Sequence, residues 1–220
     1  MLKKIIWFAV LCTLLFLLLP TSLSAPKILN VFKLTDEPDV IVRGTSGSAL
    51  TVDISFGDSE LENWIAKMEA PYPLLFVDIG WAKRFPDSIE HIQKKNIPVA
   101  LLGEEGVVYE DNPALLDKQL KEFQLLFNTK PLWFRTRDEV FPKVLQETLW
   151  KQEVNTLGST VRWNGGKLPS VIKGEILSVA LERKGQVKIE DIDRLIESRE
   201  FHSVEDVLFA TNVKTKKIPE

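Results

Sequence analysis

The sequence predicts a parallel α/β fold, a sheet or barrel with helices on its outside. Short apolar runs alternate with amphipathic stretches five or six times along the chain, and repeated strand–helix units are typical of parallel sheets. The apolar runs are hydrophobic throughout rather than alternating, which fits strands buried on both faces. A length of 220 residues allows one domain with a short appendage.

Seven segments have the composition of strands. They cover residues 40–43, 49–54, 74–78, 98–102, 131–134, 154–157 and 175–181. Before the second of these the regular pattern breaks down, so we expect a connecting stalk and a first short strand, with Gly44–Ser48 turning into the first core strand.

Two helices are expected from the spacing of apolar residues and from the residues at their starts. Leu61, Trp64, Ile65 and Met68 have the spacing of one helical face. A capping box of Ser59 and Glu62 is expected at the start of this helix. A second helix is expected behind Asn112-Pro113, which would place an N-cap before proline at the first helical position. Its apolar face is formed by Leu116, Leu120, Phe123 and Phe127.

Four further helices are expected from caps and apolar spacing. Asp87 and Glu90 suggest a capping box ahead of Ile92. Asp138 is expected to cap a helix that turns Val140, Val144 and Leu145 inward. The last two helices follow from the face formed by Ile189, Ile192, Leu195 and Ile196, and from a Ser203 cap on a short helix through Leu208.

The first 25 residues have the order of a secretory signal. Lys3 and Lys4 precede an apolar run at residues 5–19, and a small-residue segment ends at Ala25. The run falls short of the roughly 20 residues that span a bilayer comfortably. A cleaved signal peptide and a retained N-terminal membrane anchor both remain open, and either places the rest of the chain outside the cytoplasm, secreted or anchored.

The expected organisation has four parts. They are a signal peptide or membrane anchor (1–25), a stalk with a first strand (26–48), the α/β domain (49–210) and a basic tail (211–220). Removing Lys3 and Lys4 leaves 26 basic against 31 acidic residues, a formal net charge of −5. This charge argues against a nucleic-acid partner. The single cysteine, Cys12, lies in the leader, so the exported part has no thiol.

Active residues of parallel α/β folds lie at the C-terminal ends of the strands. In this sequence those ends carry carboxylates and arginines but neither histidine nor cysteine. Ser55 and Thr136 therefore lack a histidine partner, and nucleophilic catalysis of the serine–histidine type is not supported.

Five segments resemble the polysaccharide deacetylase family (NodB homology domain), most of all the sporulation-type subgroup of Gram-positive bacteria. They occur in the family's order at Ala49–Asp58, Gly80–Pro86, Lys130–Arg135, Gly174–Val179 and Phe201–Leu208. The resemblance covers about residues 49–209. It implies a distorted (β/α) barrel of about seven parallel strands.

The departures from the family pattern concern its chemistry. Active members hold a divalent metal through one aspartate and two histidines, and use a second aspartate as base and a late histidine as acid. Asp53 matches the base, but Ile54 stands where the metal-binding aspartate is common. The alignment places the family's two metal-binding histidines near Ile97 and Leu102 and its late histidine near Ala180, and this sequence has none of the three.

These losses predict an inactive relative without a metal or cofactor. Metal-assisted hydrolysis needs imidazole and carboxylate donors around an ion with an open position for water. The two histidines, His91 and His202, fall elsewhere and are expected to be structural or exposed. An oxygen-only cation site built from Asp78, Glu104, Glu105 and Glu182 is the alternative.

The candidate site residues follow from the same comparison. Asp53 is expected as a vestigial base and Arg135 as its ion-pair partner, or Asp53 simply bonds a nearby arginine or loop amide. Asp58 is a candidate binding residue or the N-cap of the next helix. Of Arg135 and Arg137, we expect only one to face the barrel interior. Trp163 is the candidate for stacking on a sugar ring from a loop, with Trp81 as the other choice.

The leading functional hypothesis is an exported, catalytically inactive deacetylase-like protein. It would act at the cell envelope as a glycan-binding or scaffold protein, in sporulation, with cell-wall glycan or an envelope protein as partner. One alternative is a divergent hydrolase acting on N-acetylated polysaccharide or peptidoglycan, and another is a pure protein-interaction module. An open pocket around Asp53 would favour a ligand, whereas a mouth filled by Leu102, Arg135 and Arg137 would favour a scaffold.

Overall fold

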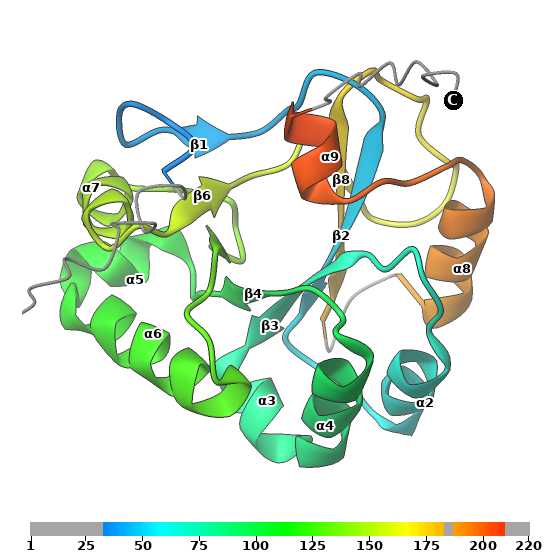
Figure 1. Cartoon of the computed structure of the whole chain (residues 1–220), viewed down its shortest axis with the longest axis horizontal. Coiled ribbons are helices and arrows are strands. Elements are labelled where there is room, and N and C mark those ends of the chain that lie inside the picture. The colour runs from blue at the N-terminus through cyan, green and yellow to red at the C-terminus, as the bar shows by residue number, and fades with distance from the viewer. Residues whose placement is uncertain (1–32, 183–186, 210–220) are drawn as a thin grey trace, which may run out of the picture. The chain divides into compact units, whose positions relative to one another are not determined.

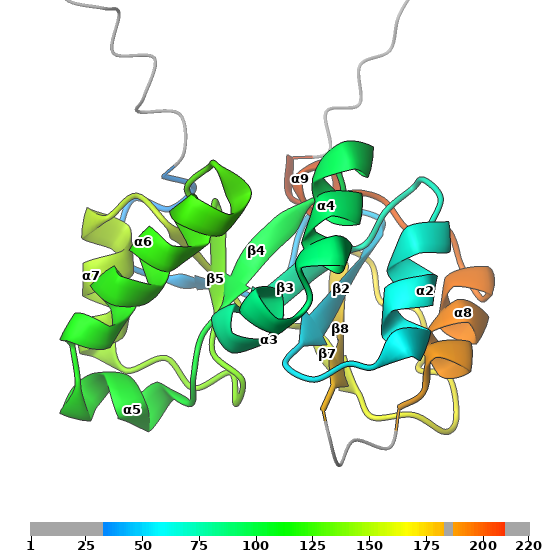
Figure 2. The same cartoon turned by 90° about the horizontal axis from the view of Figure 1, so that it is seen from below.

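The computed structural model describes residues 33–182 and 187–209. Within these residues, eight strands form one sheet in the order β1-β6-β5-β4-β3-β2-β8-β7, and every neighbouring pair is parallel. The sheet curls into an incomplete barrel (Figures 1 and 2). This confirms the expected distorted (β/α) barrel. The expected leader, most of the stalk and the basic tail lie outside the described residues. The helices of the described part are all too short or too polar to cross a membrane.

All seven expected strands are present with small shifts of their ends. The strands are β1 Val40–Ile41, β2 Ser48–Ile54, β3 Leu74–Asp78, β4 Val99–Leu102, β5 Trp133–Arg135, β6 Asn155–Leu157, β7 Val161–Trp163 and β8 Glu175–Leu181. Strand β7 was not predicted; it has three residues and pairs with β8 at the end of the sheet. Every residue of β2 is buried, as expected for a strand covered on both faces.

Most of the helices lie on the outer side of the curled sheet (Figure 1). The helices are α2 Ser59–Lys67, α3 Ile79–Arg84, α4 Pro86–Lys95, α5 Gly106–Asp111, α6 Ala114–Phe127, α7 Lys143–Lys151, α8 Ile189–Glu197 and α9 Val204–Phe209. Helix α9, in contrast to most, packs Val204 and Val207 into the smaller of two apolar clusters. Two six-residue helices, α3 and α5, were not predicted. Helix α3 follows β3 directly, because the last strand residue, Asp78, accepts a hydrogen bond from the backbone N–H of Trp81 at 2.8 Å.

Four of the expected helix starts are shifted along the chain. Asp58 rather than Ser59 caps α2, and its carboxylate accepts from the backbone N–H groups of Glu60 and Leu61. This confirms the N-cap alternative for Asp58. Helix α4 begins at Pro86 without a side-chain cap, so the capping box expected at Asp87 is absent there. Proline at the first turn supplies the helical φ that a cap would otherwise help to set.

Helix α6 begins one residue later than expected, with Pro113 itself at the N-cap position. Its predicted apolar face is buried at Leu116, Leu120, Phe123 and Phe127.

The helix expected behind Asp138 starts later than predicted. The Asp138 carboxylate accepts from the N–H groups of Gly106 and Val140 in a turn, and α7 begins only at Lys143. The shift moves the helical face, so Val140 and Val144 are 54 % and 53 % exposed rather than turned inward. Leu145 is buried as predicted.

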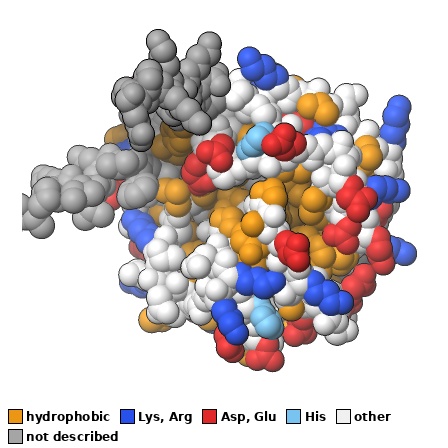
Figure 3. Space-filling view, turned by 45° about the vertical axis from the view of Figure 1, so that its right-hand side comes forward, with side chains coloured by type: hydrophobic (Ala, Val, Ile, Leu, Met, Phe, Trp, Pro, Cys, Tyr) orange, Lys and Arg blue, Asp and Glu red, His pale blue; other side chains and the backbone are white. Residues whose placement is uncertain are grey.

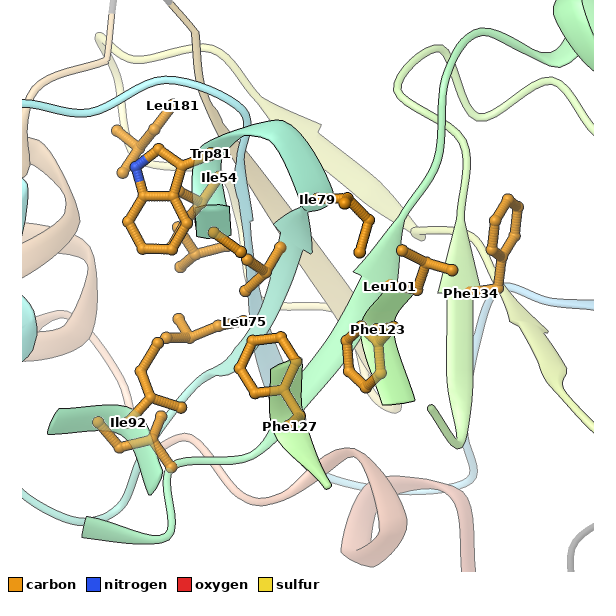
Figure 4. Packing of buried hydrophobic residues seen from close by; sticks show 14 of the residues in the cluster. Ile54, Leu75, Ile79, Trp81, Ile92, Leu101, Phe123, Phe127, Phe134 and Leu181 are labelled. Carbon is orange, nitrogen blue, oxygen red and sulfur yellow. The ribbon is translucent and has the colours of Figure 1, made fainter. Parts of the chain in front are cut away.

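The core is divided by the sheet into two apolar clusters. Along β2, Leu50, Val52 and Ile54 project into the larger cluster on the helix side. Figure 4 shows Ile54 near Trp81 and Leu181 in this cluster. The alternating residues Thr51 and Asp53 therefore project to the opposite face, toward the barrel interior. This alternation positions the polar residues of the site.

Candidate functional site

A buried ion pair lies at the C-terminal ends of β2 and β5. The Nη1 atom of Arg135 is 2.9 Å from Oδ1 of Asp53. Arg135 is fully buried and Asp53 is only 3 % exposed. The expected pair is thus present inside the barrel, and Arg135 rather than Arg137 is the inward-facing arginine.

Arg135 also connects three strands and the turn after β6. Its Nη1 donates to the hydroxyl of Thr51 at 2.7 Å, Nε donates to the carbonyl of Leu157 at 2.9 Å, and Nη2 donates to that of Gly158 at 3.1 Å. Its guanidinium carbon lies 4.2 Å from the centroid of the Phe76 ring. A guanidinium group with this many acceptors holds β2, β5 and β6 in one arrangement.

The Asp53 carboxylate is only half satisfied. Its Oδ2 atom is buried and has no hydrogen-bond partner in the described part of the chain. Burial raises the pKa of Asp53, while the guanidinium groups of Arg135 and Arg162 oppose this rise. The group therefore holds its proton more tightly than an exposed aspartate.

A second set of ion pairs crosses the mouth of the barrel. Arg137 lies 2.8 Å from Asp78 and 3.1 Å from Glu104. Arg162 on β7 lies 3.5 Å from Glu182, and its Nη1 donates to the backbone carbonyl of Arg137 at 2.7 Å. These arginines join strand ends from both halves of the sheet across the opening.

Glu139 belongs to this site and was missed by the sequence analysis. Its carboxylate accepts from the N–H of Ser159 at 2.8 Å and from the hydroxyls of Ser159 and Ser178 at 2.9 and 3.1 Å. Arg162 lies 3.9 Å away. The backbone φ of Glu139 is +54°, an uncommon left-handed conformation for a non-glycine residue. The sequence feature that could have identified Glu139 as a site residue was its position just after the C-terminal end of β5.

The residues at the mouth do not fit a catalytic metal ion. In residues 33–182 and 187–209, no group of three or more histidine, cysteine, aspartate or glutamate side chains could hold one. Asp78, Glu104 and Glu182 are instead paired with arginines. The oxygen-only cation site proposed from the sequence is therefore not supported.

Apolar side chains occupy the positions expected for the missing donors. Ala180 lies beside Asp53 in the β2–β8 register, so a methyl group stands where the late acid was expected. Leu102 is buried at the C-terminal end of β4. Ile97 precedes β4 and lies at the opposite end of that strand, so the alignment that placed a metal-ligand position there is corrected.

The tryptophans expected to stack on sugar are buried. Trp163 is 4 % exposed, lies in strand β7 and donates from Nε1 to the carbonyl of Lys167 at 3.1 Å. Trp81 is fully buried in α3 and stacks on Phe85. Neither ring offers a face to a glycan, because strand and helix formation place both in the core.

Neither histidine lies at the barrel mouth. His91 is exposed on α4. His202 bridges to Ala49 near the N-terminal end of β2, away from Asp53.

A hollow beside the C-terminal ends of β2 and β8 in the described part of the chain is small. It measures about 160 Å³ and is lined by Phe56, Asp58, Leu181 and Lys188 among others. Sites for small molecules usually measure about 300–1,000 Å³. With Leu102 and Arg135 buried and Arg137 lying across the opening, the mouth is filled.

Comparison with solved structures identifies the fold. A family 4 carbohydrate esterase pseudoenzyme from Bacillus anthracis aligns with a TM-score of 0.59 and 17 % identity, over 74 % of this chain and 64 % of that one. The family 4 carbohydrate esterase PdaA of Bacillus subtilis gives 0.61 and 14 %, over 80 % and 87 %. A chitin deacetylase of Colletotrichum lindemuthianum gives 0.62 and 13 %, over 80 % and 93 %.

These likenesses establish the polysaccharide-deacetylase fold expected from the sequence. This chain spans slightly less than two thirds of the length of the Bacillus anthracis pseudoenzyme. Neither a known family model nor a curated protein matches the sequence. Membership of the sporulation-type subgroup stays a prediction.

Proposed function

We propose that this chain is a non-catalytic protein of the polysaccharide-deacetylase fold that acts as a scaffold at the cell envelope. The observation that carries the proposal is the filled barrel mouth, where arginine–carboxylate pairs and apolar side chains replace an open metal site. A hydrolase of this fold needs the same space for its metal, its water and its substrate.

The chemistry of the remaining side chains supports inactivity. Without imidazole donors to hold a metal ion, nothing lowers the pKa of water toward neutrality. Without a general acid the departing amine is not protonated, which typically costs a factor of about 10²–10⁴ in rate. Asp53 alone, buried against Arg135, supplies neither function.

A scaffold is favoured over a glycan-binding cleft by the same geometry. The hollow near Asp58 is small and both candidate stacking tryptophans are buried. A pseudoenzyme of this fold is known from Bacillus anthracis, and a mutant of that protein has restored enzymatic activity. Export rests on the leader pattern at residues 1–25, and a role in sporulation rests on the subgroup resemblance.

An acetate-release assay tests the proposal. The full chain is incubated with N-acetylated peptidoglycan, with and without Zn²⁺, beside an active peptidoglycan deacetylase as control. We expect no acetate above the buffer level, and metal-dependent release by this chain would overturn the proposal.

Thermal melting gives an independent reading of the metal site. A ligand at about 100 times its dissociation constant adds about 2.7 kcal/mol to the stability of the folded state. We expect Zn²⁺ to leave the melting temperature unchanged, because the donors for a site are missing. A clear rise of the melting temperature with Zn²⁺ would show that the folded chain has a metal site and would contradict the proposal.

A divergent hydrolase is the second candidate, favoured by the unpartnered Oδ2 atom of Asp53. If residual hydrolysis of an envelope glycan exists, Asp53→Asn should abolish it. Activity that survives this substitution would exclude Asp53 as the base.

A pure protein-interaction module is the third candidate. A sedimentation assay with insoluble peptidoglycan distinguishes such a module from a scaffold that binds glycan. A chain that stays in the supernatant favours the interaction module, whereas one that sediments favours contact with glycan.

A further inference from the structure

An apolar groove crosses the end of the sheet at which β2, β3 and β4 begin. It consists of two hollows of about 630 and 680 Å³. They adjoin each other, because Pro71, Pro73 and Ile196 line both. Leu50, at the start of β2, lies in the groove, so the groove is at the opposite end of the strands from Asp53. Each hollow is within the size range of known ligand sites, about 300–1,000 Å³.

The walls of this groove are apolar and partly aromatic. Figure 3 shows hydrophobic side chains gathered in a hollow, with acidic side chains along much of its border and basic side chains along part of it. Trp64 and Ile196 contribute from α2 and α8, and the half-buried rings of Tyr72 and Phe201 contribute from the loops before β3 and α9. An apolar hollow of this kind gains free energy when another apolar surface covers it.

The groove offers no edge to which a strand could be added, because β2, β3 and β4 are each paired on both sides. Pro71, Pro73 and Pro98 line the groove just before β3 and β4, and proline has no backbone N–H to donate to an added strand. A polyproline-II segment does not need such donors, because its backbone carries no internal or ladder hydrogen bonds. Aromatic grooves are a common binding surface for such segments.

The border of the groove has an excess of negative charge. Its five carboxylates are those of Glu60, Glu69, Asp193, Glu200 and Asp206. Two cations, Lys67 and Arg199, lie among them. Arg199 is already paired at 2.7 Å with the buried carboxylate of Glu175, so it does not offset the border. A segment with lysine or arginine on both sides of its apolar part would be attracted to this border.

We propose that this groove binds an extended, proline-containing apolar segment of another protein that is flanked by basic residues. The aromatic and proline side chains of the groove suit a polyproline-II segment, and the acidic border favours basic flanks. The proposal concerns the end of the barrel opposite to the filled mouth, so it stands or falls independently of the missing catalysis.

The test uses three fluorescein-labelled peptides with the same core, Leu-Pro-Pro-Leu-Pro. The core is flanked on both sides by Lys-Lys, Ser-Ser or Glu-Glu, and binding to the full chain is measured by fluorescence anisotropy. We expect affinity in the order Lys, Ser, Glu, with the Lys-flanked peptide bound at least about tenfold more tightly than the Glu-flanked one. Its affinity should fall as salt is added.

Matched surface variants locate the binding site. Ile196→Ser removes an exposed apolar side chain from the groove, and Val144→Ser removes one from α7, with 37 % and 53 % exposure in the wild type. We expect Ile196→Ser to weaken the Lys-flanked peptide about tenfold and Val144→Ser to leave it unchanged. Circular dichroism confirms that both variants are folded.

A charge reversal tests the border in the same way. Glu69→Lys should weaken the Lys-flanked peptide and strengthen the Glu-flanked one, whereas Glu110→Lys on α5 should change neither. The proposal is overturned if wild-type chain binds none of the peptides, or if the groove and control variants behave alike. It is also overturned if the chain self-associates and Ile196→Ser abolishes this, since a second copy would then be the occupant.

Discussion

The substitution Arg135→Met tests whether the buried ion pair holds the barrel together. Methionine keeps an unbranched side chain of similar length but removes every donor. The Asp53 carboxylate would then be buried without a partner, and the carbonyls of Leu157 and Gly158 would lose their hydrogen bonds. Removing one partner of a buried pair typically costs about 3–5 kcal/mol, a large part of the about 5–15 kcal/mol that stabilises a typical domain.

The measurement is urea unfolding of the full chain, followed by tryptophan fluorescence and extrapolated to water. Asp53→Asn is the matched partner variant, because Arg135 keeps its bonds to Thr51, Leu157 and Gly158. It should cost about 1–3 kcal/mol. The double variant should lose about 0.5–3 kcal/mol less stability than the sum of the losses measured for the two single variants. A loss below about 1 kcal/mol for Arg135→Met, or strict additivity, would refute the reasoning.

Three further predictions concern titration, packing and a second buried pair. Because burial raises the pKa of Asp53 above its ordinary value of 3.8, its contribution to stability is full below that value and is lost as pH rises through the folded-state pKa. Relative to Asp53→Asn, the wild-type chain should therefore lose stability as the pH rises above about 4, and a difference in urea unfolding that stays constant with pH would contradict this. Trp163→Ala should destabilise the fold by about 3–5 kcal/mol, because the ring is in the core; unchanged stability would instead indicate an exposed ring. Arg199→Met should lower the free energy of unfolding by about 3–5 kcal/mol, because it leaves Glu175 buried without its cationic partner. The double variant Arg199→Met/Glu175→Gln should recover part of this loss, and no recovery would show that the pair does not contribute to stability.

Elements with long apolar runs were predictable from the sequence. The bounds of β3 and β8 coincide with the prediction because each run consists mostly of apolar residues and ends at a change of composition. Strand β7 was missed because three residues carry no periodicity, and its pairing with β8 is a tertiary contact. Helix α3 was missed because Asp78 is both the last residue of β3 and the cap of the helix, so no turn separates them.

The site was predictable only in part. The ion pair of Asp53 and Arg135 was expected from a family resemblance. Glu139 was not found, because its inward direction depends on a left-handed backbone and on two distant serines. Trp163 was placed in a loop because two glycines follow closely, whereas pairing with β8 buries it.

The presence of a motif residue in this fold is weak evidence of catalysis when that residue also has a structural role. Arg135 bonds acceptors on β2, on β6 and just after β6, so its loss would leave a buried carboxylate and two carbonyls unpaired whether or not any reaction occurs. Asp53 in turn balances that buried guanidinium, and at 3 % exposure it is not placed to reach a water and a substrate together. Imidazoles at the levels of Leu102 and Ala180 would have no comparable structural role, because apolar side chains fill both positions in a packed fold. The identity of these two residues therefore bears on catalysis more directly than the survival of Asp53, and both residues fit the proposed scaffold role.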